Sequence, residues 1–173
     1  MRAILFLVVT AAAGTAGCSG CPASALGIGC SEERTFRDTG KLCLYPASET
    51  QGTPAPGAPP IDSTRSRTYE ADQPVNVAVR FDACLSSSCS VDRKAGCTAE
   101  LVAGNGQRLV VGSYGSYQQK AQGACTADCG SLIARCSSPP LPAGNYTVEH
   151  GSASSPFTIP FDGPPPCLDT AEP

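Results

Sequence analysis

The sequence is poor in the residues that most often carry out chemistry. Its 173 residues include no tryptophan and one histidine, and only 16% of them are charged. A Ser-His-Asp device would have to use His150, and no Gly-x-Ser-x-Gly elbow accompanies it. No phosphate-cradling glycine-rich loop, zincin helix or calcium loop is present. We therefore predict no catalytic residues, no cofactor and no metal, and we interpret His150 as a packed or strand-edge histidine.

The chain also lacks an excess of positive charge. It has 12 Lys and Arg against 15 Asp and Glu, for a net charge of −3. The basic residues are scattered; Arg65 and Arg67 come nearest to a cluster, and we interpret them as part of a solvated loop before a strand. Binding of nucleic acid requires a basic face that neutralises phosphates. Nucleic acid is therefore not an expected partner.

The first 17 residues have the layout of a secretory signal. Arg2 is followed by an apolar run and then by small residues, and the whole is too short for a membrane-spanning helix. Such a leader directs export, and export places the remaining cysteines in an oxidising compartment.

The end of the leader, Thr15-Ala16-Gly17-Cys18, resembles the lipobox of bacterial lipoproteins, although that family usually has a large aliphatic residue in place of Thr15. The resemblance implies that Cys18 carries a lipid that anchors the protein to a membrane, with the outer membrane or cell surface of a bacterium as the expected location. The alternative is ordinary cleavage within residues 11–16, which would leave a soluble protein. The cysteine count favours lipidation, because eleven is odd and the loss of Cys18 leaves ten for pairing.

We predict that these ten cysteines form disulfides. They are Cys21, Cys30, Cys43, Cys84, Cys89, Cys97, Cys125, Cys129, Cys136 and Cys167. Some spacings are short enough for metal binding, but a structural zinc site needs reduced thiolates in close pairs or additional histidines. Connectivity cannot be deduced from so many possible pairings. A hairpin-sized loop makes Cys89 with Cys97 our one suggested pair.

Alternating patterns indicate β-strands. Val75, Val77, Val79 and Phe81 would share one face of a half-buried strand. Residues 98–103 and 107–111 flank Asn105-Gly106, a strong hairpin signal. Residues 41–45 could form a further strand, and residues 131–136 either a strand or one helical turn.

The segment Leu141-Pro142-Ala143-Gly144-Asn145-Tyr146-Thr147-Val148, followed by Phe157, Ile159 and Phe161 on one face, resembles the closing hairpin of bacterial immunoglobulin-like and fibronectin-like sandwiches. That resemblance implies a corner hydrogen bond from Tyr146. We therefore expect an all-β, disulfide-rich immunoglobulin-like β-sandwich of about seven strands with an irregular N-terminal segment. The resemblance to these sandwiches implies nothing specific about function.

The expected organisation is a signal peptide (1–17), a lipid-anchored tether with a Pro/Gly linker (18–62), a β-sandwich (63–162) and a C-terminal tail (163–173). We predict a non-enzymatic cell-envelope lipoprotein that acts as a binding or structural module. Its partners would be the membrane, through the lipid, and an envelope protein or glycan.

The alternatives are a secreted hydrolase that uses serine or carboxylates, and a protease-inhibitor-like scaffold that presents residues 112–120 as a rigid loop. In that stretch, Gly112 to Tyr117 combine small and aromatic residues suited to a binding surface or to an ordinary turn.

Overall fold

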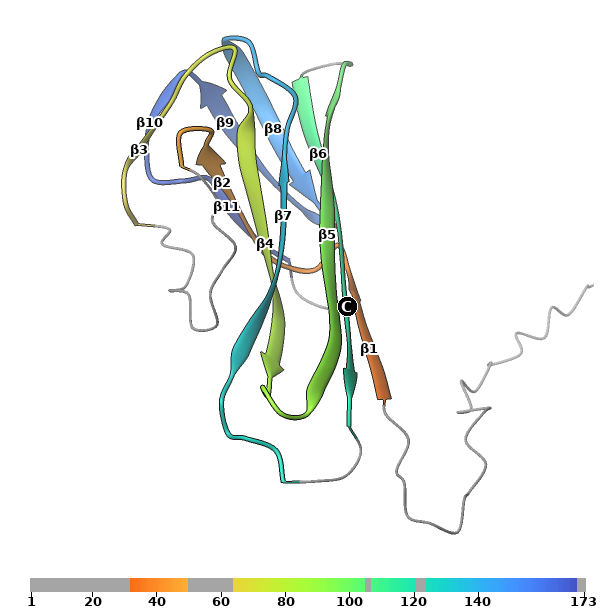
Figure 1. Ribbon diagram of the computed structural model, residues 1–173. Coiled ribbons are helices and arrows are strands. Elements are labelled where there is room, and N and C mark those ends of the chain that lie inside the picture. The colour runs from red at the N-terminus through yellow and green to blue at the C-terminus, as the bar shows by residue number, and fades with distance from the viewer. Residues whose placement is uncertain (1–31, 50–63, 105–106, 121–123, 171–173) are drawn as a thin grey trace, which may run out of the picture.

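The computed structural model describes residues 32–49, 64–104, 107–120 and 124–170. Within these ranges the chain forms eleven strands and no helix (Figure 1). The strands are β1 (Glu32–Arg37), β2 (Gly40–Pro46), β3 (Arg67–Tyr69), β4 (Val75–Leu85), β5 (Ser90–Val102), β6 (Gln107–Gln119), β7 (Gly130–Ser137), β8 (Gly144–His150), β9 (Ala153–Ile159), β10 (Phe161–Gly163) and β11 (Cys167–Thr170). The predicted all-β class is confirmed. No helix in the described ranges is long and apolar enough to cross a membrane.

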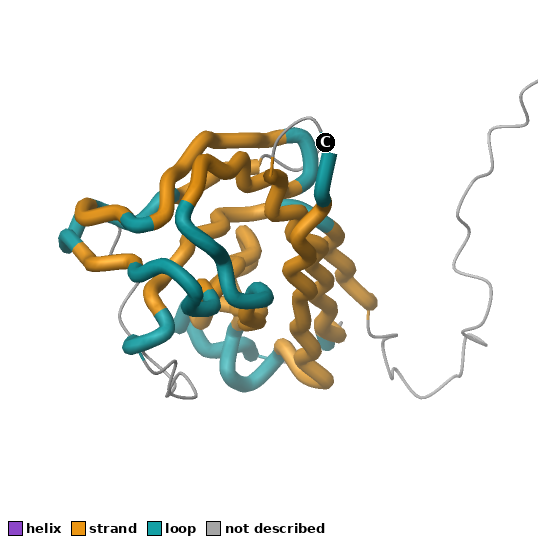
Figure 2. Tube along the Cα trace, turned by 90° about the horizontal axis from the view of Figure 1, so that it is seen from above, coloured by secondary structure: helices purple, strands orange, loops and turns teal. Residues whose placement is uncertain are grey.

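The strands form three sheets. One has five strands: β6 pairs with β5 along one edge and with β1 and β8 along the other, and β8 pairs in turn with β9. The second has four strands in the order β11-β2-β4-β7, and β10 pairs with β3 alone. Residues from both large sheets contribute to one buried hydrophobic cluster. Figure 2 shows the same strands from above, with loops and no helix between them in the described part of the chain. The two large sheets are therefore held together by a shared core.

Strand β4 confirms the alternation read from the sequence. Val75, Val77, Val79 and Phe81 are at most 2% exposed and belong to the main core. Ala78, on the opposite face, is also fully buried, in a smaller cluster with Cys43 and Tyr45. The centre of β4 is thus covered on both faces, and is more deeply buried than the predicted half-buried strand.

The predicted hairpin around residues 105–106 is also present. Strands β5 and β6 pair in register from Val102 opposite Arg108 to Cys97 opposite Ser113. The two turn residues lie outside the described ranges. The sequence left open which hairpin face is buried; Leu109 and Val111 enter the core, whereas Leu101 and Val102 are each 36% exposed.

The closing hairpin consists of β8 and β9, which pair from Gly144 opposite Ile159 onward. The Tyr146 hydroxyl donates to the Pro142 carbonyl oxygen at 2.6 Å, which confirms the expected corner hydrogen bond. Phe157 and Ile159 are buried as predicted, but Phe161 is not on their strand. It begins β10 after Pro160 and places its ring 5.8 Å from that of Tyr69.

Ordered structure extends beyond the residues expected to form the sandwich. Strands β1 and β2 come from the segment expected to be a tether, and β11 comes from the expected tail. Strands β2 and β11 are part of the four-stranded sheet, because β2 pairs with β4 on one side and with β11 on the other. The ambiguous residues 131–136 lie in strand β7, which hydrogen-bonds to β4.

Four disulfides join the described cysteines: Cys43–Cys167, Cys84–Cys129, Cys89–Cys125 and Cys97–Cys136. The suggested Cys89–Cys97 pair is wrong. The chain does not turn back between these positions, because β5 runs extended from Ser90 to Val102. Eight residues of strand span roughly 26 Å, whereas disulfide-bonded Cα atoms lie about 4.4–6.8 Å apart. Cys18, Cys21 and Cys30 lie outside the described ranges.

Candidate functional site

The most unusual feature of the larger sheet is a junction on one edge of β6. Strand β8 runs parallel to β6 along Gln107–Val111, and β1 runs antiparallel to it along Tyr114–Gln119. Gly112 and Ser113 lie between the ends of these two neighbours. A sheet edge interrupted in this way leaves backbone groups that need other hydrogen-bond partners.

Asp38 supplies those partners for Ser113. The Ser113 amide donates to Asp38 Oδ1 at 2.6 Å, and the Asp38 amide donates to the Ser113 carbonyl oxygen at 3.0 Å. Asp38 has a φ of 53°, in the left-handed region that Asp tolerates better than most residues. At Asp38 the chain leaves β1 and crosses to β2 in the other sheet. The second carboxylate oxygen accepts no hydrogen bond from the described residues.

The inward side of the junction holds His150. Its Nε2 lies 2.9 Å from Ser113 Oγ, and its Nδ1 lies 3.2 Å from Thr170 Oγ1. The Thr170 hydroxyl donates to the His150 carbonyl oxygen at 3.2 Å, so its oxygen accepts from Nδ1–H. This assigns the tautomer in which Nε2 accepts the Ser113 hydroxyl proton.

His150 is 1% exposed, so it is packed, as the sequence indicated. Burial lowers the pKa of its imidazole, and the negative charge of Asp38 acts in the opposite direction. Because Ser113 and His150 lie in one sheet and Thr170 in the other, their hydrogen bonds join the two sheets. Histidine and serine are thus brought together in the interior.

The outward side of the junction is a hollow of about 420 Å³, which we call the outer hollow. Its principal lining residues are Arg37, Asp38, Gly96, Thr98, Gly112 and Tyr114. A smaller hollow of about 230 Å³ adjoins it, shares Asp38 and Gly112, and extends to Glu149. The Arg37 guanidinium carbon lies 5.8 Å from the centre of the Tyr114 ring.

The structure corrects the expectation for residues 112–120. Residues 112–119 lie within strand β6, with β5 along one side and β1 beside residues 114–119 on the other, and do not form a loop. The sequence suggested a turn there because glycine and serine are frequent in turns, but here the small residues permit close packing. A Cβ on Gly115 would lie 2.8 Å from the Phe81 ring. This segment therefore cannot be presented to a protease as a protruding loop.

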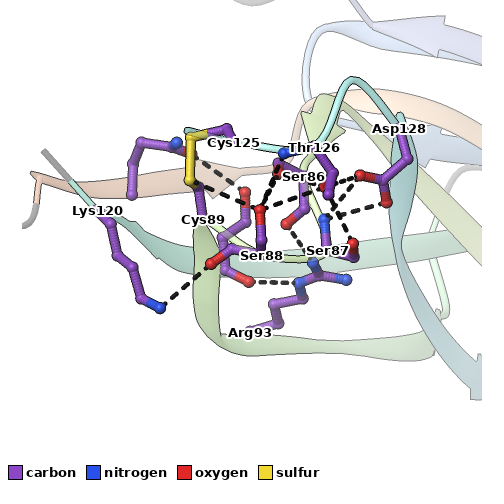
Figure 3. The surroundings of a disulfide bond; sticks show 11 residues. Ser86, Ser87, Ser88, Cys89, Arg93, Lys120, Cys125, Thr126 and Asp128 are labelled. Atoms are coloured by element: carbon purple, nitrogen blue, oxygen red, sulfur yellow. Dashed lines mark hydrogen bonds between the residues drawn. A yellow bond between two sulfur atoms is a disulfide. The ribbon is translucent and has the colours of Figure 1, made fainter. Parts of the chain in front are cut away.

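A second polar cluster surrounds the Cys89–Cys125 disulfide (Figure 3). The Thr126 hydroxyl donates to Asp128, and the Ser87 amide donates to both carboxylate oxygens, at 3.2 and 3.1 Å. The Thr126 hydrogen bond, followed by that from Ser87, lowers the pKa of Asp128. Arg93 donates to the Ser86 carbonyl oxygen at 2.8 Å. These bonds fix the loops on either side of the Cys89–Cys125 bridge.

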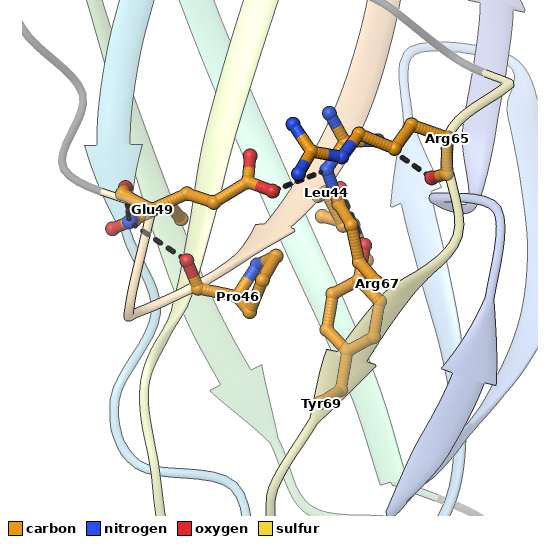
Figure 4. A network of polar contacts seen from close by, with 7 residues as sticks. Leu44, Pro46, Glu49, Arg65, Arg67 and Tyr69 are labelled. Atoms are coloured by element: carbon orange, nitrogen blue, oxygen red, sulfur yellow. Dashed lines mark hydrogen bonds and ion pairs between the residues drawn. The ribbon is translucent and has the colours of Figure 1, made fainter.

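A third cluster surrounds Arg67 (Figure 4). Its Nε lies 2.8 Å from Glu49 Oε1, its side chain is 7% exposed, and its guanidinium carbon lies 4.9 Å from the centre of the Tyr45 ring. Tyr69 donates to the Leu44 carbonyl oxygen at 2.9 Å, and burial raises the pKa of its hydroxyl. The expected position of Arg67 in a solvated loop is wrong, because Arg67 belongs to strand β3 and its side chain packs on the Tyr45 ring of β2.

A hollow of about 420 Å³ lies beside the Arg67 cluster and is lined in part by Tyr69, Glu70 and Gln73. In the described ranges no three His, Cys, Asp or Glu side chains are grouped so that they could hold a metal ion. The chain matches no protein-family model, no curated protein and no solved structure.

Proposed function

We propose that this protein is an exported, non-enzymatic lipoprotein of a bacterial cell envelope, anchored through Cys18 and acting as a binding module. The observation that carries the proposal is the set of four disulfides, because such bonds persist in oxidising compartments outside the cytoplasm. The signal-like residues 1–17 support export, and the lipobox-like sequence supports anchoring. Multiple acyl chains would give stable membrane attachment without a spanning helix.

We also propose that the fold is an immunoglobulin-like β-sandwich. Two sheets share one core, Cys97–Cys136 joins β5 of one sheet to β7 of the other, and Tyr146 makes the corner hydrogen bond. Each of these features is found in immunoglobulin-like sandwiches. The parallel pairing of β6 with β8 is an additional feature of this chain.

The proposal is tested by the state of the mature N-terminus. We expect the wild-type protein to fractionate with membranes, to incorporate an alkyne-labelled fatty acid and to begin at Cys18 with the mass of the acyl groups. A Cys18→Ser variant should lose the label and leave the membrane fraction, whereas Ser19→Ala, one residue away, should keep both. A mature N-terminus upstream of Cys18 without acyl mass would contradict the anchor.

One observation favours a second candidate, a serine hydrolase. Ser113 Oγ lies 2.9 Å from His150 Nε2, the distance expected of a nucleophile and its general base. Ser113 and His150 are only 6% and 1% exposed, and Nδ1 is oriented by the neutral hydroxyl of Thr170 in place of a carboxylate. These facts favour a structural role.

A fluorophosphonate probe tests the hydrolase directly. The binding-module proposal expects no covalent labelling of the folded protein. Labelling that disappears in Ser113→Ala but persists in Ser116→Ala, a buried serine on the same strand, would establish the hydrolase instead.

A further inference from the structure

The outer hollow follows from small residues placed side by side on the outward face of the sheet. Gly112 on β6 lies opposite Thr98 on β5, and Gly96 lies opposite Tyr114. A Cβ built on Gly96 would meet nothing within 4 Å, and one on Gly112 would lie 3.3 Å from Thr98 Oγ1. The two glycines thus form a floor, with Tyr114 rising beside it.

The rim of this hollow combines an aromatic ring with both signs of charge. Tyr114 is 36% exposed and is one of the three exposed large hydrophobic residues in the described ranges. Arg37 and Thr98 are exposed residues, and Asp38 is half-buried with one carboxylate oxygen that accepts from Ser113. The hollow therefore offers hydrogen-bond donors and acceptors around an aromatic wall, with no net charge from Arg37 and Asp38.

We propose that the outer hollow binds a neutral oligosaccharide. Sugar hydroxyls donate and accept hydrogen bonds, so one ring can engage the Arg37 guanidinium and the free Asp38 oxygen together. The apolar C–H groups of the sugar contact Tyr114 and the glycine floor. A phosphate or carboxylate ligand would gain no net charge attraction, because Asp38 offsets Arg37, and an apolar ligand would leave both charges desolvated.

This inference rests on the proposed binding role, which it narrows to a glycan class. The volume of about 420 Å³ is within the range of small-molecule sites, and it suits one or two sugar rings. The open shape predicts modest affinity, because much of the ligand surface would remain in water.

The test uses the full-length mature protein and a panel of chitotriose, cellotriose and maltotriose, measured by saturation-transfer NMR and titration. We expect at least one trisaccharide to bind. Gly96→Leu should weaken that binding at least tenfold, because the new side chain fills the hollow without meeting other atoms near its Cβ. Gly104→Leu is the matched control: its Cβ also meets nothing within 4 Å, but it lies outside the hollow, and its binding should be unchanged.

Two further variants examine the wall and the rim. Tyr114→Ala should weaken binding about tenfold, whereas Tyr114→Phe should retain most of it because the ring remains. Asp38→Asn should reduce binding and leave the fold intact, as judged by circular dichroism, because the amide oxygen still accepts from Ser113.

Absence of binding by all three trisaccharides at millimolar concentration, or equal binding by Gly96→Leu and wild type, would overturn the inference. Either result leaves the lipid anchor untouched, since that is decided by the mass of the mature N-terminus. Conversely, trisaccharide binding in the hollow by a protein without lipid on Cys18 would support the glycan inference and contradict the lipid anchor.

Discussion

Removal of individual disulfides should destabilise the fold by unequal amounts that follow from their connectivity. We consider two double variants, Cys43→Ala/Cys167→Ala and Cys89→Ala/Cys125→Ala. Cys43 and Cys89 are both deeply buried, at 0% and 3% exposure, whereas Cys167 is half-buried and Cys125 is exposed. Packing losses therefore add to the cost of the Cys43→Ala/Cys167→Ala variant, in the same direction as the chain entropy that each bridge removes from the unfolded state.

The Cys89–Cys125 bridge closes a short loop when its neighbour is intact. Its sequence separation is 36, but the Cys84–Cys129 bridge provides a covalent detour. Along that detour the unfolded loop contains only about nine residues. The chain-entropy relation then gives about 2.6 kcal/mol at 25 °C.

The Cys43–Cys167 bridge closes a much longer loop. Its sequence separation is 124, and the detour through Cys84–Cys129 shortens the loop only to about 80 residues. The same relation gives about 4.5 kcal/mol. Loss of this bridge should therefore cost about 2 kcal/mol more than loss of Cys89–Cys125.

The assay is equilibrium unfolding in urea without reductant, with the free energy of unfolding taken by linear extrapolation. Intact-mass measurement should first confirm that the other bridges remain formed in each variant. Equal losses for the two variants, or a larger loss for Cys89→Ala/Cys125→Ala, would refute the connectivity argument.

Three other perturbations probe the strand junction and the closing hairpin. Gly151→Ala should lower the free energy of unfolding, measured by calorimetry, by at least about 1 kcal/mol. The reason is that Gly151 has a φ of 55° and a Cβ there would collide with the Asp38 carbonyl oxygen. An unchanged melting temperature would contradict this. Tyr146→Phe should cost about 1 kcal/mol in urea unfolding through loss of the 2.6 Å bond to Pro142, and a neutral effect would show that the bond contributes nothing net. Burial lowers the pKa of His150 in the folded protein, whereas the pKa in the unfolded chain is about 6.5. Below about pH 6.5 the unfolded state therefore binds more protons than the folded state. The free energy of unfolding should therefore fall with decreasing pH by up to about 1.4 kcal/mol per pH unit between the unfolded and the lower folded pKa. This fall should be absent in His150→Gln, and parallel pH profiles for the two proteins would contradict it.

Local patterns predicted local structure well. The alternation from Val75 to Phe81 identified a strand whose centre is deeply buried, and Asn105-Gly106 placed the hairpin between two strands that pair as expected. Tyr146 was correctly given its corner hydrogen bond. These signals work because strand periodicity and turn chemistry are properties of a few consecutive residues.

The candidate site was only partly visible in the sequence. Gly112 to Tyr117 was singled out for its small and aromatic residues, and Tyr114 does border the outer hollow. Its secondary structure was misjudged, because glycine and serine in β6 look like turn residues until their strand neighbours are known. The contributions of Arg37, Asp38 and Thr98 were missed, since nothing in their local sequence marks them.

By itself, the sequence determined the all-β class, the best-patterned strands and the inward position of their alternating side chains, because burial of apolar groups acts on every strand in the same way. Only the tertiary structure decided which cysteines pair, which hydroxyls contact His150, and where Asp38 meets Ser113. Those contacts join residues tens of positions apart, and their geometry depends on how the two sheets are placed on each other. Short-range patterns carry no information about that placement.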